Sequence, residues 1–189
     1  MESQTKQWKA TWVVVISLCA VGVGLFAIFG LWKLWRRVSE GNDISLDQTS
    51  LAVGSAAPDF ELQALSGETV RLSQYRGQPV LLTFGTSWCP DCRNELPVLK
   101  QLQEAHPELV ILMIDRKESA VVVQAYVDEF EITHPVLLDT DGAVAELYQV
   151  IAIPTELFLD ADGIIRAKII ESVTWKRLKE VLPSIGIEP

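Results

Sequence analysis

The chain has 189 residues, of which 49% are hydrophobic and 22% charged, and its formal net charge is −9. This length allows one globular domain and a further segment, and it exceeds the size at which a core depends on disulfide bonds. The acidic balance argues against nucleic-acid binding, because neutralising phosphates requires a basic face.

The first distinctive segment is an uncharged run of twenty residues from Trp12 to Leu31. A helix of that length spans roughly 30 Å, which is the thickness of a membrane's hydrocarbon core. We therefore predict that residues 12–32 are a transmembrane anchor in contact with lipid. The short segment 1–11 precedes this anchor, and the polar segment 33–52 is expected to be a linker.

A cleaved signal peptide is the alternative to an anchor. The apolar run is longer than the core of a signal peptide, and no cleavage motif of small residues follows it closely, so we favour the anchor. The positive-inside rule does not fix its orientation. Basic residues lie on both sides of the run, at Lys6, Lys9, Lys33, Arg36 and Arg37.

Residues 53–189 carry the patterns of a folded domain, with strands and helices in alternation. The expected strands are 58–62, 69–72, 80–84, 110–114, 136–138, 157–160 and 164–170. The expected helices are a segment from the cysteines to 105, with a kink at Pro97, and 119–130, 142–148 and 174–182. The valines 121–123 leave a strand open as the alternative for the second helix. This order predicts a mixed sheet with helices on both faces and a hairpin at each end of the domain.

Two cysteines three residues apart follow the apolar strand 80–84, in the sequence Trp88-Cys89-Pro90-Asp91-Cys92. A C-x-x-C motif beside a strand-to-helix pattern indicates a redox-active dithiol, because the amides and dipole of a helix start stabilise a thiolate. The third cysteine, Cys19, lies in the predicted anchor and is interpreted as a small packing residue.

A half zinc site and a static disulfide are the structural alternatives to a redox centre. Zinc requires four ligands, and the chain has no second C-x-x-C motif. His106 and His134 each precede a proline at an expected element end, and we interpret both as solvated surface residues. We therefore expect no metal site.

Three residues near the cysteines could tune their chemistry. Asp91 would disfavour a neighbouring thiolate and so favour a role as a reductant. Alternatively, it could be a solvated acid that interacts only with the helix dipole. Pro90 lies where the first turn of a helix tolerates proline. Glu95 follows Cys92 by three residues and could exchange a proton with it, or it could be an ordinary surface glutamate.

The segment from Leu72 to Pro97 resembles the thioredoxin-like family, in particular the membrane-anchored thiol-disulfide oxidoreductases of the TlpA, ResA and CcmG type. Ile153-Pro154-Thr155, followed by the segment 157–163, is similar to the second landmark of that family. The resemblance implies an α/β thioredoxin fold with an N-terminal β-hairpin and a central αβ insertion near residues 119–138.

The resemblance also implies roles for the residues around the dithiol. Cys89 would be the nucleophile, exposed at the helix start, and Cys92 would resolve the mixed disulfide. Glu95 matches an active-site acid of ResA-type proteins. Thr83 stands where thioredoxin has a buried aspartate, so Glu95 is the nearest candidate for that proton-handling role.

Substrate binding is implied for residues in two other segments. Pro154 matches the family's cis-proline, which exposes the backbone at Ile153 for pairing with an extended substrate, whereas the sequence alone would favour a trans turn proline. Trp88 would cover the dithiol, with core packing as its alternative. Glu156 could adjust the choice of partner or face solvent.

The function implied is reduction, rather than oxidation, of protein disulfides by an enzyme whose only cofactor is its redox-active disulfide. The expected partners are protein thiols and disulfides, apocytochrome c among them, and a membrane electron donor. The domain would lie outside the cytoplasm, on a single-pass anchor in the cell membrane. A non-catalytic binding module is one alternative. A thiol peroxidase is another, suggested by Thr86-x-x-Cys89, although Leu82 stands where that motif has proline.

Overall fold

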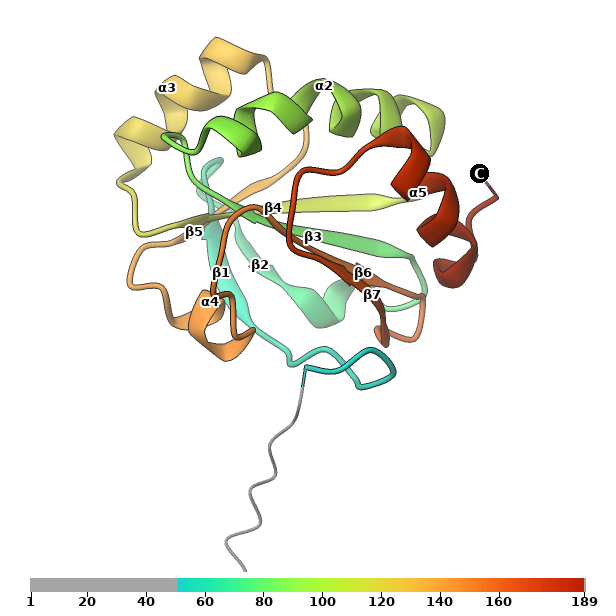
Figure 1. Ribbon diagram of the computed structural model, residues 1–189. Helices are drawn as coiled ribbons and strands as arrows, with labels where there is room; N and C mark the ends of the chain where they lie inside the picture. Colours follow the sequence, from blue (N-terminus) through green and yellow to red (C-terminus); the bar gives the residue numbers. More distant parts are fainter. Residues whose placement is uncertain (1–50, 189) are drawn as a thin grey trace, which may run out of the picture. The chain divides into compact units, whose positions relative to one another are not determined.

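The computed structural model describes residues 51–188, so the predicted anchor 12–32 with Cys19, the segment 1–11 and most of the linker 33–52 lie outside the described residues. Within the described part of the chain, no helix has the length and apolar character needed to cross a membrane. The described residues form one mixed sheet with helices on both faces (Figure 1).

The elements follow the order that the sequence predicts. The strands are β1 (Glu61–Ala64), β2 (Thr69–Arg71), β3 (Val80–Gly85), β4 (Val110–Arg116), β5 (Val136–Asp139), β6 (Thr155–Leu159) and β7 (Ile165–Ile169). The helices are α2 (Pro90–Ala105), α3 (Ala120–Phe130), α4 (Ala143–Leu147) and α5 (Trp175–Val181), with short 3₁₀ helices η1 (Leu72–Tyr75) and η2 (Leu182–Ile185). The valines 121–123 lie in α3, which confirms the helix prediction for that segment.

The sheet contains seven strands in the order β2-β1-β5-β4-β3-β6-β7. The strands β3, β4 and β5 are parallel, whereas β6 and β7 form an antiparallel hairpin beside β3. The N-terminal hairpin of β1 and β2 pairs with β5, so α3 and β5 form an inserted αβ unit between the hairpin and β4. This arrangement confirms the thioredoxin-like fold with its hairpin and its insertion.

Hydrophobic side chains fill the space on each side of the sheet. On one face, α2, α3 and α5 cover the sheet, and Leu99 of α2 packs into the same cluster as Leu81 and Phe158. On the other face, α4 and η1 cover it, and Tyr148 packs against the rings of Phe60 and Phe84. Because helices cover both faces, the central strands β3 and β6 are buried over their whole length.

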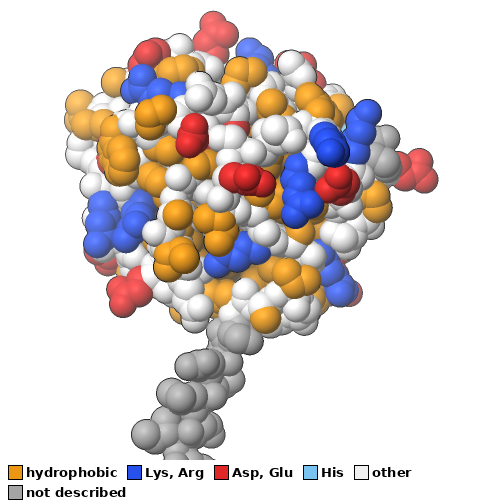
Figure 2. All heavy atoms as spheres, viewed as in Figure 1, with side chains coloured by type: hydrophobic (Ala, Val, Ile, Leu, Met, Phe, Trp, Pro, Cys, Tyr) orange, Lys and Arg blue, Asp and Glu red, His pale blue; other side chains and the backbone are white. Residues whose placement is uncertain are grey.

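Charged side chains of both signs are spread over the molecular face that Figure 2 shows. Acidic and basic groups lie between hydrophobic ones, and neither sign gathers into a continuous patch on that face. A surface of one sign would attract oppositely charged partners over long distances, and the face in view lacks that feature.

Candidate active site

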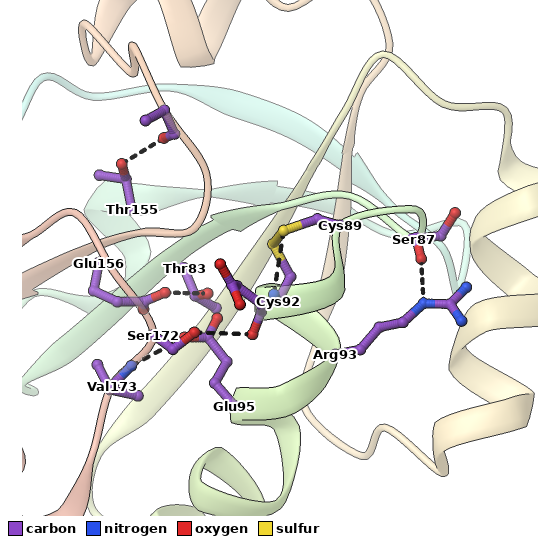
Figure 3. Close-up of a disulfide and its surroundings, with 12 residues drawn as sticks. Thr83, Ser87, Cys89, Cys92, Arg93, Glu95, Thr155, Glu156, Ser172 and Val173 are labelled. Atoms are coloured by element: carbon purple, nitrogen blue, oxygen red, sulfur yellow. Dashed lines mark hydrogen bonds between the residues drawn. A yellow bond between two sulfur atoms is a disulfide. The ribbon is translucent and has the colours of Figure 1, made fainter.

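Cys89 and Cys92 form a disulfide at the start of α2, with their Cα atoms 5.3 Å apart (Figure 3). Cys89 is the N-cap residue of the helix, and the backbone N–H of Cys92 donates a hydrogen bond to Cys89 Sγ at 3.2 Å. Pro90 occupies the first helical position, where its missing N–H costs nothing. A thiolate on Cys89 would therefore be stabilised by a backbone amide and by the positive end of the helix dipole.

The exposure of this pair differs from the expectation. Cys89 is only 4% exposed and Cys92 2%, so the prediction of an exposed nucleophile is wrong for the disulfide form. The reason is that Cys89 Sγ is bonded to Cys92 Sγ at the start of α2. It also accepts a hydrogen bond from the backbone N–H of Cys92. The neighbouring Trp88 is 66% exposed, so core packing is excluded as its role.

Two charged residues that the sequence did not single out hold the loop before Cys89. Glu118 accepts hydrogen bonds from the backbone N–H of Ser87 and, at 2.7 Å, from its hydroxyl. The Arg93 Nε donates to the carbonyl oxygen of Ser87 at 2.6 Å, and the guanidinium lies over the rings of Tyr126 and Phe130. In the sequence, only the position of Arg93 directly after Cys92 indicates that it could hold the loop before Cys89.

The peptide bond between Ile153 and Pro154 is cis, as the resemblance implied. Phe84 of β3 pairs with Thr155 of β6, so Pro154 directly precedes the strand that pairs with the one leading to the cysteines. The Thr155 hydroxyl donates to the carbonyl oxygen of residue 152 at 2.7 Å and fixes the turn before the strand. The role of Trp88, Ile153 and Pro154 in substrate binding stays a prediction.

Glu95 is buried on the inner face of α2, with an exposure of 2%. The backbone N–H of Val173 donates to its Oε2 at 3.2 Å. Burial raises the pKa of Glu95 to about 7, although the hydrogen bond from the Val173 backbone lowers it. A carboxyl group with this pKa can both take and release a proton near neutral pH, and the surface alternative for Glu95 is wrong.

Glu156 is fully buried in β6, which excludes the solvent-facing interpretation. It lies opposite Thr83 in the sheet register, and the Thr83 hydroxyl donates to Glu156 Oε1 at 2.8 Å. Figure 3 shows these two side chains and Glu95 on the same side of the disulfide. Burial, and then the negative charge of Glu95, raises the pKa of Glu156 well above its usual range. In the sequence, the feature that indicates this buried acid is an acidic residue next to an apolar strand segment.

A third acidic residue lies next to the cysteine helix. Asp115 of β4 pairs with Gly85 and is 1% exposed, and neither of its carboxyl oxygens has a hydrogen-bond partner among the described residues. Burial, and then the proximity of the acidic Glu118, raises the pKa of Asp115 to about 8. Gly85 itself leaves room for the disulfide, because a Cβ atom there would lie 3.2 Å from Cys92 Sγ.

The two histidines are not solvated surface residues, and that prediction is wrong. His134 is 9% exposed, and its Nε2 atom is buried without a hydrogen-bond partner among the described residues. Burial lowers the pKa of His134 to about 4. The His106 side chain is 14% exposed and lies 3.5 Å from Glu108. Within residues 51–188, no group of three or more histidine, cysteine or acidic residues could hold a metal ion.

Comparison with known proteins agrees with this geometry. The AhpC/TSA family matches residues 53–168. Thiol-disulfide oxidoreductase ResA of Geobacillus thermodenitrificans is 29% identical over 187 residues, which cover 98% of this chain and 99% of that protein. The thioredoxin-like protein YneN of Bacillus subtilis is 31% identical, covering 85% of this chain and 94% of that protein.

Solved structures show the same fold. A DsbE-type thiol:disulfide interchange protein from Chlorobium tepidum superposes with a TM-score of 0.68 at 25% sequence identity. The match covers 72% of this chain and all of that protein. The similarity therefore extends over the described domain, including the strand-to-helix junction that holds the disulfide.

Proposed function

The chain belongs to the AhpC/TSA family and is a thiol-disulfide oxidoreductase, and from this premise we propose that it reduces protein disulfides outside the cytoplasm. The observation that carries the proposal is the Cys89–Cys92 disulfide at the start of α2. In the reduced protein the Cys89 thiolate attacks a substrate disulfide and forms a mixed disulfide. Cys92 then attacks Cys89 Sγ, which releases the second substrate thiol and passes two electrons to the substrate.

The negative groups around the dithiol support reduction as its direction. Asp91 lies in the first turn of α2, two residues after Cys89, whose sulfur would carry charge in the reduced protein. A carboxylate close to a thiolate destabilises it and so favours the disulfide form of the couple. A dithiol that prefers to be oxidised is a good electron donor.

The proposal extends to location and partners. The segment 12–32 anchors the chain as a single-pass protein in the cell membrane, a membrane electron donor restores the dithiol, and apocytochrome c is among the substrates. Similarity to ResA over 98% of the chain, including the segment that precedes the described domain, supports this arrangement. A reporter fused to the C-terminus tests the topology, and a cytoplasmic signal would contradict it.

Substitution of each cysteine tests the reaction. With insulin as substrate and dithiothreitol as reductant, Cys89→Ser is expected to abolish disulfide reduction, whereas Cys92→Ser is expected to retain attack and accumulate a mixed disulfide with the substrate. Retention of full activity by Cys89→Ser would overturn the reductase function and favour a non-catalytic binding module.

The direction of electron flow is tested by the reduction potential of the Cys89–Cys92 pair. We expect a value near that of thioredoxin, ~−270 mV, when the full-length protein is equilibrated with glutathione and thioredoxin buffers. A value near that of the oxidant DsbA, ~−120 mV, would instead assign the protein to disulfide formation.

Peroxide reduction is a second candidate function, for one structural reason. The Thr86 hydroxyl, three residues before Cys89, is buried and has no hydrogen-bond partner among the described residues. It could therefore donate to a bound peroxide. Stoichiometric consumption of hydrogen peroxide by the reduced protein would establish this activity, and Thr86→Val would be expected to remove it.

A further inference from the structure

The environment of Glu156 does not suit a charged carboxylate. The side chain has no exposed surface, and it shares its side of the sheet with Phe158, beneath α2. Among the described residues, no lysine, arginine or histidine forms an ion pair with Glu156 or with Glu95. A fully buried carboxylate without a positive partner is strongly disfavoured, so Glu156 is expected to hold its proton.

The hydrogen bonds of Glu156 leave one of its two oxygens available to carry that proton. Oε1 accepts from the Thr83 hydroxyl at 2.8 Å, whereas Oε2 is buried without a hydrogen-bond partner. The carboxyl group of Glu95, from α2, is the ionisable group that faces Glu156. Asp91 and Tyr126 are the other titratable groups that act on Glu95, and neither supplies positive charge.

We propose that Glu156 is a positioning residue that stays protonated, donates its Oε2 hydrogen to Glu95, and thereby holds Glu95 as the carboxylate that receives the proton of Cys92. This inference rests on the proposed reductase function. Glu95 lies one helical turn after Cys92, and both residues are on the buried face of α2.

The proton and electron balance of the resolving step is as follows. The Cys92 thiol transfers its proton to the Glu95 carboxylate while its sulfur attacks Cys89 Sγ in the mixed disulfide. The bond between Cys89 and the substrate sulfur breaks, and the substrate leaves as a thiolate with the electron pair of that bond. Glu95 then releases the proton to the leaving thiolate or to solvent. The dithiol is oxidised, the substrate disulfide is reduced, and Glu156 keeps its proton throughout.

A pair of substitutions separates hydrogen-bond donation from acidity at position 156. Glu156→Gln keeps a neutral donor of similar shape, whereas Glu156→Met has similar length and cannot donate. The measurement is the rate at which the prereduced full-length protein reduces a disulfide peptide between pH 5.5 and 9. Glu95→Gln is the control that removes the proton acceptor itself.

We expect Glu156→Gln to keep the pH midpoint of the wild-type rate profile. Glu156→Met should move that midpoint upward by about one to two pH units, the equivalent of losing one hydrogen bond to a charged group. At pH 7 its rate should fall by about 5- to 50-fold, with recovery at high pH. An unchanged midpoint in Glu156→Met, or the same shift in Glu156→Gln, would overturn the proposal.

A second measurement does not depend on turnover or on the folding of the methionine variant. Carboxyl-carbon NMR of the wild-type disulfide form should show one glutamate signal that stays protonated to pH 8, and this signal should be missing from Glu156→Gln. Ionisation of that group below pH 7 would overturn the proposal. If the wild type shows this signal but reduces no disulfides, the proposed function fails while the carboxyl pair stands.

Discussion

The Glu95 carboxyl group accepts a hydrogen bond, but it lies where burial disfavours its charged form. Val173 stabilises its carboxylate form through a backbone N–H, yet burial dominates and raises the pKa to about 7. In the unfolded chain the same group ionises with an ordinary pKa near 4.5. The native state therefore loses stability as the pH rises from 4.5 through 7, because the unfolded chain releases the proton first.

Glu95→Gln is expected to stabilise the protein at pH 8 and to change its stability little at pH 4. At pH 8 the variant no longer carries a buried charge, and the gain is up to about 3 kcal/mol in the free energy of unfolding. The amide oxygen of glutamine can still accept from Val173. Urea unfolding of the full-length disulfide form at both pH values measures the effect. An equal shift at the two values would show that Glu95 does not titrate in this range.

The elements were predictable where local pattern and backbone chemistry decide them. The hairpin of β1 and β2, the helix start at the cysteines and the final hairpin all follow from periodicity and turn residues, and the structure contains them. Glu156 was not assigned to the interior, because an acidic residue in a strand is usually at the surface and its burial depends on α2 covering β6. His134 was misplaced for the same reason, since its surroundings come from segments distant in the sequence.

The start of α3 is hydrogen-bonded to the loop before α2, so a substitution there is expected to affect both elements. Glu118, just before α3, accepts two hydrogen bonds from Ser87. Glu118→Ala is expected to lower the free energy of unfolding by about 1–3 kcal/mol, since both donors lose a charged acceptor. It should also raise amide exchange at residues 86–88. Glu118→Gln, which keeps an acceptor, should lose less, and equal losses would contradict the role of the hydrogen bonds.

Across the whole molecule, buried groups of opposite kinds act on stability in opposite directions. Burial raises the pKa of Glu95 to about 7 and of Asp115 to about 8, so both reduce native stability as the pH rises toward those values. Burial lowers the pKa of His134 to about 4, so this residue reduces stability as the pH falls from 6.5 toward 4. Between pH 5 and pH 8 the loss of stability from two carboxyl groups outweighs the gain from one imidazole. We therefore expect the protein to be more stable at pH 5 than at pH 8.

His134→Gln isolates the imidazole from this balance. The histidine must remain neutral in the native state, while in the unfolded chain it binds a proton below pH 6.5, so wild-type stability is lost as the pH falls through this range. The free energy of unfolding of the variant minus that of the wild type should therefore be larger at pH 5 than at pH 8, by up to about 2 kcal/mol. Any packing loss from the substitution is common to both pH values and cancels in that difference. Thermal and urea unfolding of both proteins at the two pH values provide the measurement. A difference of the opposite sign would mean that His134 is charged in the native state.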